Sequence, residues 1–261
     1  MLELYHSEPN IYYLKPLIAL EEVKAPFASR YFDPTSFEQY SPSFPQSVES
    51  GLNLEREGPI LVDGVTVLSS SFFILEYIAE AFPAANLLPG EAHEHYRVRA
   101  WGQFIALQLS PGVCALGCAK YLAPVLKSRD PGQLRARIER IEPLERRAAW
   151  MAVIDGSYDE KTLASVREQV KMPVKRIEDA LGRASWLAGP AYSVADIDAF
   201  AMLSPLVDLA PEALSEKAAP RIMQFLRRMR ERPAVQRALA FAKTARPQEA
   251  FVPGAEPSRW G

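Results

Sequence analysis

Two short stretches of the sequence carry polar groups that could hold a small ligand. The first is Gly58-Pro59, where a proline stands at the head of the apolar run Ile60–Val62. Proline lacks an N–H and is tolerated at the first residue of a strand, so a purely structural role is one interpretation. The position also suits a cis peptide bond, which would leave the N–H and C=O of the preceding residue exposed for pairing with a peptide backbone.

The second stretch is Ser69-Ser70-Ser71, which directly precedes an apolar helical pattern. The free N–H groups and the positive dipole end of a helix N-terminus attract carboxylates. Ser71 is therefore either an N-cap alone or an N-cap that also holds an anion. Together with the strand edge at Pro59, this helix start could hold an acidic peptide at two points.

A hairpin and a helix must bring these two stretches together. Asp63-Gly64 lies between Ile60–Val62 and Val65–Leu68, which predicts a β-hairpin. Ser71–Phe82 then reads as an amphipathic helix that stops at Pro83. The elements expected before the hairpin are a strand, a helix and a second strand, at Leu2–His6, Tyr13–Val23 and Ala28–Phe32.

Beyond a linker over residues 84–93, the pattern predicts only helices. They are expected at His95–Leu126, Gln133–Ile154, Leu163–Leu181, Val194–Leu209, Pro220–Arg230 and Ala234–Ala242. The first of them should bend or break at Pro111, and the second should break near Pro143. Ser193 and Asp196 have the spacing of a capping box at the start of a buried helix. The arrangement indicates a small α/β domain over residues 1–83, docked on an all-α domain over 94–246, with an extended tail over 247–261.

The overall composition excludes several classes of function. The chain has 261 residues and 48% hydrophobic content, enough for a sizeable core. A net charge of −2 provides no attractive electrostatic field for nucleic acid or for an anionic membrane. The N-terminus lacks the pattern of a signal peptide, and no run of about 18 uninterrupted apolar residues is present. We therefore expect a cytoplasmic protein without nucleic-acid or membrane partners.

The other reactive side chains have plainer interpretations. Cys114 and Cys118 are four residues apart on one predicted helix face, and buried thiols are favoured over a metal or redox pair. His93 and His95 lack a third ligand, so solvated side chains are favoured over a zinc site. No resident metal is expected.

The order of these motifs resembles the cytosolic glutathione transferase family. The resemblance rests on "GPILVDG" followed by "LSSSFFILEYI", on "YSVADIDAF" and on "RERPAVQRAL". Four further features resemble the bacterial β-etherase branch: "LYHSEPNIYYLKPLIALEE", the loop Phe32–Gln39, "RVRAW" and Trp150. Enzymes of that branch cleave the β-aryl ether bond of lignin-derived aromatics with glutathione.

The resemblance implies a fold, a co-substrate and a dimer. The fold is a thioredoxin-like domain followed by an all-helical domain, and glutathione would lie along the first. Gly58, before Pro59, would bond to the cysteine portion of glutathione through its backbone, and the positions of Ser70 and Ser71 would hold the γ-glutamyl end. A residue just after the first strand would stabilise the thiolate, which is the nucleophile. The aromatic ether would sit between the domains.

Three parts of the implied glutathione site depart from the family pattern. Tyr12-Tyr13 replaces an Asn-Ser pair, so Tyr13, or its neighbour Tyr12, would have to stabilise the thiolate or would serve only in packing. Ser70 replaces a glutamate that pairs with the γ-glutamyl ammonium, a loss of ~1.5–3 kcal/mol. The loop that begins at Asn53 keeps this asparagine but carries two acids where the anionic peptide should lie.

These departures leave three hypotheses. The first is a subunit of a glutathione-dependent β-etherase, as the weakly catalytic partner in a heterodimer. The second is an active homodimeric glutathione transferase that uses Tyr12 or Tyr13. The third is a binding or structural protein on this fold without glutathione chemistry.

Overall fold

A four-stranded sheet with the strand order β2-β1-β3-β4 forms the base of the N-terminal domain. Its strands are β1 (Leu2–His6), β2 (Phe27–Tyr31), β3 (Ile60–Asp63) and β4 (Thr66–Leu68). β1 pairs in parallel with β2 and antiparallel with β3, and the hairpin β3–β4 forms the other edge. The computed structural model describes residues 1–41, 44, 58–156 and 158–254. The expected strand–helix–strand and hairpin order is present in the described residues.

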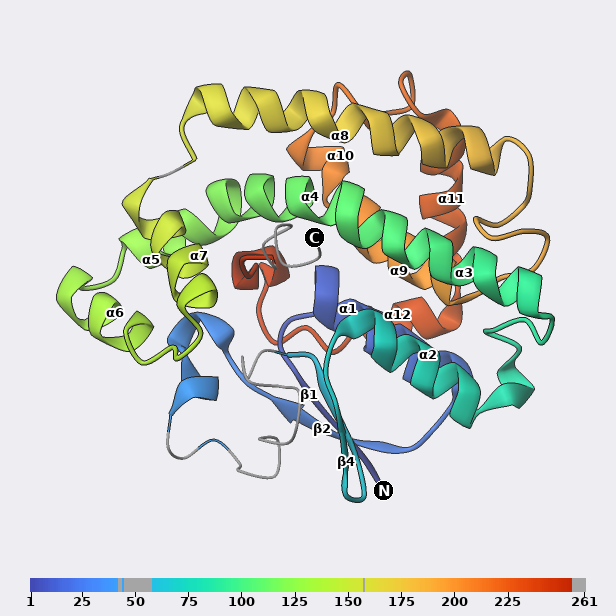
Figure 1. Cartoon of the computed structure of the whole chain (residues 1–261), viewed down its shortest axis with the longest axis horizontal. Helices are drawn as coiled ribbons and strands as arrows, with labels where there is room; N and C mark the ends of the chain where they lie inside the picture. Colours follow the sequence, from blue (N-terminus) through green and yellow to red (C-terminus); the bar gives the residue numbers. More distant parts are fainter. Residues whose placement is uncertain (42–43, 45–57, 157, 255–261) are drawn as a thin grey trace.

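Helices α1 (Ile11–Val23) and α2 (Ser71–Ala81) pack against each other between this sheet and the rest of the molecule (Figure 1). The face of α1 turned away from the sheet meets two helices of the C-terminal half, α9 (Val194–Leu203) and α12 (Pro233–Leu239). Leu17, Ile18 and Leu20 are therefore completely buried. Because α1 is covered on both sides, it has no broad solvent-exposed face, and most of its side chains are apolar.

The C-terminal half is helical, as the sequence predicts. Its helices are α3 (Ala92–Phe104), α4 (Ser110–Gly117), α5 (Ala123–Lys127), α6 (Pro131–Ile138), α7 (Leu144–Asp155), α8 (Glu160–Leu181), α9 (Val194–Leu203), α10 (Leu206–Leu209), α11 (Pro220–Glu231) and α12 (Pro233–Leu239). The chain enters this half through the 3₁₀ turn Pro83–Ala85. The described residues therefore form a thioredoxin-like α/β half followed by an all-α half.

The first long helix differs from expectation at its prolines. Residues Ala92–Lys127 form one uninterrupted helical segment rather than a helix broken at Pro111. A π-helical turn at Ile105–Leu109 comes just before Pro111, and a second at Cys118–Leu122 comes just before Pro124. A wider turn at these points accommodates the missing N–H without ending the helix. This segment is long and apolar enough to cross a membrane, but 56% of its most apolar window is buried inside the protein, as in a core helix.

The predicted capping box fixes the start of the central helix α9. The buried Asp196 carboxylate accepts hydrogen bonds from the backbone N–H of Ser193 at 2.9 Å and of Leu187 at 2.8 Å. Burial raises the pKa of Asp196 to about 6, although these hydrogen bonds oppose the shift. The motif therefore ties the loop before α9 to the first turn of the helix.

The residues that follow α12 return to the N-terminal domain. Their 3₁₀ turn, Pro247–Ala250, is tied to the start of α1 because the Asn10 side-chain amide donates to the carbonyl of Pro247 at 2.8 Å. Phe251 and Val252 then enter the protein and are buried. The expectation of an extended tail was therefore incomplete. The prolines of this segment predict an extended backbone. They do not predict that the apolar side chains between them are buried against the C-terminal half.

Candidate functional site

The end of the β3–β4 hairpin brings four of the predicted site residues together. Leu61 pairs with Leu68, so the residues before β3 and after β4 meet at the same end of the hairpin. Gly58 and Pro59, joined by a cis peptide bond, lie on one side of it. Ser70 and Ser71 lie on the other side, where α2 begins.

The start of α2 is an uncapped helix N-terminus. Ser70, rather than the expected Ser71, occupies the N-cap position, and its side chain makes no capping hydrogen bond. Ser71 is the first helical residue and is buried, and the first turn contains no acidic residue. The first N–H groups of a helix have no partner within it, so they are available to an anion.

The backbone of Ser70 is unusual for a residue that is not glycine. Its φ of 69° lies in the left-handed region, with a ψ of 116°. Such conformations cost free energy and cluster at ligand-binding positions. The exposed Ser70 therefore marks this helix start as a candidate ligand site independently of the sequence motif.

Tyr13 lies beneath this site rather than in it. Only 1% of its surface is exposed, and its ring packs edge-on against Phe32 with centroids 5.9 Å apart. A Cβ added at Gly58 would lie 2.6 Å from Cε1 of Tyr13, so the glycine and the ring are in direct contact. The structure therefore brings Tyr13 to the predicted position but covers its side chain.

Tyr12 points to the other side of α1, toward the C-terminal half. Its hydroxyl lies 2.8 Å from Oγ of Ser110 and 3.0 Å from Sγ of Cys114, both on α4. Burial, followed by the neighbouring Cys114, raises the pKa of Tyr12 well above its ordinary value. Burial likewise raises the pKa of the Cys114 thiol. Both groups are therefore neutral at physiological pH and act as hydrogen-bond partners rather than bases.

A buried ion pair lies next to Tyr12. The Lys15 ammonium is 2.6 Å from Oδ1 of Asp198 on α9, and both side chains are almost fully buried. The same ammonium lies 5.2 Å from the centroid of the Tyr12 ring. Burial raises the pKa of Asp198, and the positive charge of Lys15 opposes this shift. The pair joins α1 of the N-terminal half to α9 of the C-terminal half.

The predicted residues thus divide into three groups. Gly58, Pro59, Ser70 and Ser71 share one end of the hairpin, with Tyr13 packed below Gly58. Tyr12 faces α4 instead. Asn53 lies outside the described residues.

Sequence reasoning missed Lys15 and Asp198. A lysine inside the otherwise apolar "YLKPLIAL" was the available signal, since a charge on a buried helix face needs a partner.

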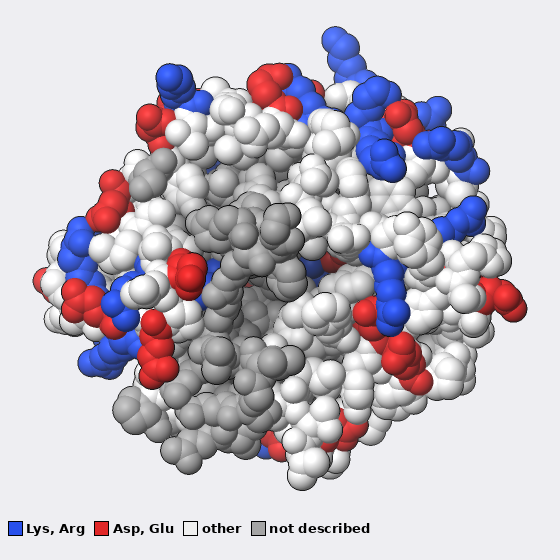
Figure 2. Space-filling model, in the orientation of Figure 1, with Lys and Arg blue, Asp and Glu red and all other residues white. Residues whose placement is uncertain are grey.

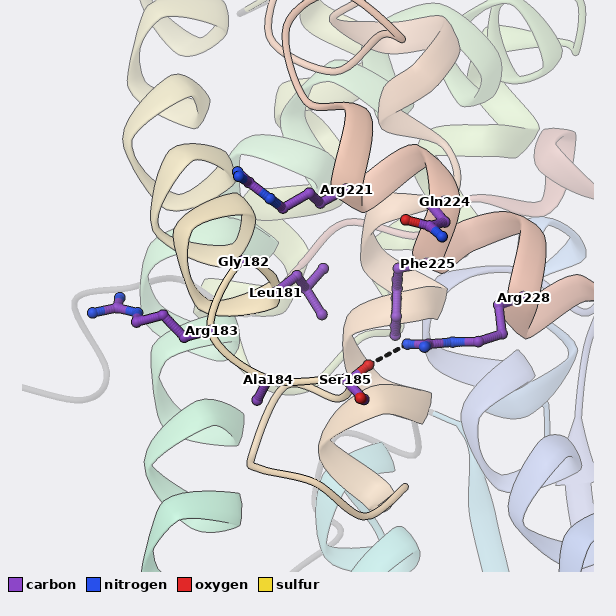
Figure 3. Close-up of a pocket in the computed structure, with 9 residues that line it drawn as sticks. All are labelled: Leu181, Gly182, Arg183, Ala184, Ser185, Arg221, Gln224, Phe225 and Arg228. Atoms are coloured by element: carbon purple, nitrogen blue, oxygen red, sulfur yellow. Dashed lines mark hydrogen bonds between the residues drawn. The ribbon is translucent and has the colours of Figure 1, made fainter.

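The cavities found in the described residues are lined by other parts of the chain than this end of the hairpin. Figure 3 shows one of about 370 Å³ between the end of α8 and α11, lined by Arg183, Arg221 and Arg228 among others. Each of these arginines already has a partner: a backbone carbonyl for Arg183 and Arg228, and Glu178 for Arg221. Figure 2 shows Lys and Arg side chains above this region, along the second half of α8. In the described part of the chain, no group of three His, Cys, Asp or Glu side chains could hold a metal ion.

Comparison with known protein families gives two matches that agree with this geometry. Residues 1–80 match the model of the glutathione S-transferase N-terminal domain. Residues 141–233 match the model of the glutathione S-transferase C-terminal domain. Together they cover more than half of the chain.

Individual relatives agree with the family models. Protein LigF from Sphingobium sp. (strain NBRC 103272 / SYK-6) is 25% identical over 240 residues, covering 90% of this chain and 91% of LigF. The crystal structure of the β-etherase LigF from strain SYK-6 superposes with a TM-score of 0.84 at 24% identity, covering 92% of this chain and 99% of LigF. A glutathione transferase family member from Pseudomonas fluorescens pf-5, solved with two glutathione bound, has a TM-score of 0.68 at 22% identity, covering 91% and 92%.

Proposed function

Because the chain belongs to the glutathione S-transferase family, we propose that it binds glutathione at the end of the β3–β4 hairpin and acts in glutathione-dependent cleavage of aryl ethers. The observation that carries the proposal is the meeting of Gly58-Pro59 with the uncapped start of α2. The name of the relative LigF, a β-etherase similar over nearly the whole chain, supports the reaction type.

Each part of glutathione has a group to meet it. The backbone of Gly58 would pair with the cysteine portion, as the edge of a sheet pairs with a peptide. The N–H groups at the start of α2, with Ser71, would hold the γ-glutamyl carboxylate. Ser70 offers no charge to the γ-glutamyl ammonium, so we expect affinity about 10- to 100-fold below that of a site with a carboxylate there.

The reaction is a displacement at carbon. The glutathione thiolate attacks the carbon that bears the aryl ether, a carbon–sulfur bond forms, and the carbon–oxygen bond breaks as its electron pair leaves with the phenolate. The group that would stabilise the thiolate in this chain is Tyr12 or Tyr13. Tyr13 is covered, and the Tyr12 hydroxyl already bonds to Ser110 and Cys114. These contacts support weak catalysis by this chain alone.

A dimer with a related chain would supply the missing group. Helices α2 and α3 expose large apolar side chains, with Phe73 on α2 56% and Tyr96 on α3 70% exposed. A cavity of about 420 Å³ beside α3 is lined by Tyr96, Trp101 and Phe104. We propose that the exposed surface of these two helices pairs with a second subunit, either a copy of the chain or a relative that carries a thiolate-stabilising serine, in the cytoplasm.

Calorimetric titration of the purified chain with reduced glutathione at neutral pH tests the proposed binding of glutathione. We expect saturable binding in the high micromolar to low millimolar range. Ser71→Ala should weaken it several-fold, whereas Ser128→Ala, at the end of α5 and far along the chain, serves as the matched control. Absence of any heat from the wild-type chain at these concentrations would contradict glutathione binding.

A turnover assay distinguishes an active homodimer from a heterodimer with a related subunit. A model β-aryl ether is incubated with glutathione and the released phenol is measured. Release by the chain alone that is lost in Tyr12→Phe or Tyr13→Phe would identify an active homodimer. Release only after mixing with a related subunit would support the heterodimer. No release in either case, despite glutathione binding, would exclude ether cleavage.

A further inference from the structure

The last described residues of the chain occupy a defined place between α1 and α4. Phe251 is 1% exposed, and its ring lies directly over Gly117. A Cβ added at Gly117 would be only 2.2 Å from this ring, and the Tyr121 ring is 5.9 Å away between centroids. The absence of a side chain at Gly117 therefore creates the notch that holds Phe251.

A buried arginine fixes the backbone that follows. Arg146 on α7 donates hydrogen bonds to the carbonyl of Pro253 at 3.1 Å and to that of Gly254 at 2.8 Å. The Arg146 side chain is almost fully buried, so these charge-assisted bonds are shielded from water. The position of the segment is therefore set by specific side chains and is not that of a loose chain end.

Gly254 lies at the hydroxyl of Tyr12. A Cβ added at Gly254 would be 2.9 Å from Sγ of Cys114 and 3.2 Å from Oη of Tyr12. The chain's own backbone thus fills the space beside these two groups. The next residue in α1, Tyr13, packs against Gly58, where we place the cysteine portion of glutathione.

We propose that Phe251–Gly254 occupy the place of the aromatic substrate and that the site opens when this segment withdraws. The identity of the displaced ligand rests on the proposed function. That Phe251–Gly254 close the space beside Tyr12 and Cys114 rests on geometry alone. The segment has the same chemistry as the ligand it would exclude, because it offers a phenyl ring and apolar groups to an apolar wall on α4. A substrate gains access only by competing with it.

Labelling of Cys114 tests the closure without any need for catalysis. The probe is 5,5′-dithiobis(2-nitrobenzoate), an aromatic disulfide: the thiolate displaces one aryl thiolate, which is measured by absorbance, and a mixed disulfide forms. Truncation after Ala250 removes the segment, whereas truncation after Gly254 retains it and is the matched control. We expect the first truncation to label at least about tenfold faster than the full chain, and the second to label at the rate of the full chain.

Further variants show which thiol gives the fast labelling and replace the truncated chain if it does not fold. Cys114→Ser in the truncated chain should remove the fast phase, since the remaining thiol, Cys118, is fully buried. If the truncated chain does not unfold cooperatively, Arg146→Gln in the full chain replaces it, because it removes the charge that holds the two carbonyls. Arg147→Gln, which removes a charge next to it on α7, is the control. Labelling rates within twofold of the full chain in both Arg146→Gln and the truncation would overturn the closure.

Ligand binding distinguishes this inference from the proposed function. Calorimetry with the model aryl ether should show at least about tenfold tighter binding to the chain truncated after Ala250. Weaker binding would mean that the segment is a wall of the site, and would overturn the proposal. If glutathione fails to bind any variant while labelling still accelerates on truncation, the proposed function falls and the closure stands.

Discussion

Lys15 shows how one side chain can join the two halves of the molecule. Its ammonium is buried against the carboxylate of Asp198, which belongs to the other half. A buried ion pair adds little over an apolar pair of the same shape, because both charges lose their hydration. The pair matters for stability because removing one partner leaves the other charge buried without a counter-charge, which is costly.

Asp198→Asn should therefore be far more damaging than its small change in volume suggests. It leaves the Lys15 charge buried without a counter-charge, and we expect a loss of ~3–5 kcal/mol in the free energy of unfolding. Urea denaturation measures this loss. Asp179→Asn, which breaks the exposed pair with Lys175 on α8, is the control and should lower the free energy of unfolding far less. Equal losses at the two positions would contradict a special role for the buried pair.

Tyr12 makes a second, weaker connection between the halves. Tyr12→Phe keeps the ring but removes the hydroxyl that bonds to Ser110 and Cys114, so we expect a loss of ~1 kcal/mol in the free energy of unfolding. Tyr96→Phe removes an exposed hydroxyl and should change stability by less than about 0.5 kcal/mol. An unchanged unfolding midpoint in Tyr12→Phe would show that the hydroxyl does not support the interface.

At the scale of single elements, most of the secondary structure could be predicted because its signals are local. The Asp63-Gly64 turn, the alternation in Leu2–His6 and the capping box at Ser193 each act within a few residues. The uninterrupted helix through Pro111 could not be predicted, because a π-turn is selected by packing on both sides of the helix. The outer boundaries of the other helices agree with the structure to within a few residues. The expected break near Pro143 separates α6 from α7, whereas Val194–Leu209 forms two helices, α9 and α10, rather than one.

The candidate site could be predicted only in part, for the same reason. The hairpin and the start of α2 carry local signals, so Gly58 and Ser71 were found. The roles of Tyr12 and Tyr13 could not be separated, because neighbouring residues of a helix point about 100° apart. Which of them faces Gly58 and which faces α4 depends on how the two halves dock.

The start of α9 predicts a dependence of stability on pH. The pKa of Asp196 is raised from 3.8 to about 6, so the folded protein holds this proton more tightly than the unfolded chain. This contribution is complete below pH 3.8 and is lost as the pH rises through about 6. Asp196→Asn carries no titrating group, and its amide cannot accept as many hydrogen bonds, so it should be less stable by ~1–3 kcal/mol near pH 4.

Thermal unfolding at a series of pH values measures the difference between the wild-type chain and Asp196→Asn. We expect the difference to narrow as the pH rises from about 4 to about 7. A constant difference over this range would show that Asp196 does not titrate abnormally.

At the scale of the whole molecule, the exposed apolar surface of α2 and α3 predicts self-association. Phe73 on α2 and Tyr96 on α3 expose large rings, and exposed apolar surface of this kind marks an interaction site. Sedimentation should show a dimer at micromolar concentration. Phe73→Ser together with Tyr96→Ser should weaken it at least tenfold, and Met172→Ser, at an exposed apolar residue on α8, should leave it unchanged. A monomer at all concentrations would contradict this interface for the isolated chain.

The contacts of α1 with residues far along the chain have a consequence for biosynthesis. A ribosome makes α1 early, but Asp198, the helices α9 and α12 that cover α1, and the segment that Asn10 holds all emerge late. Domains generally begin to fold from the N-terminus as they emerge, yet here α1 keeps one apolar face and one lysine without partners until α9 and α12 have been made. Nascent chains that end before Asp198 should therefore be bound by chaperones and cut by proteases, whereas released chains should resist both.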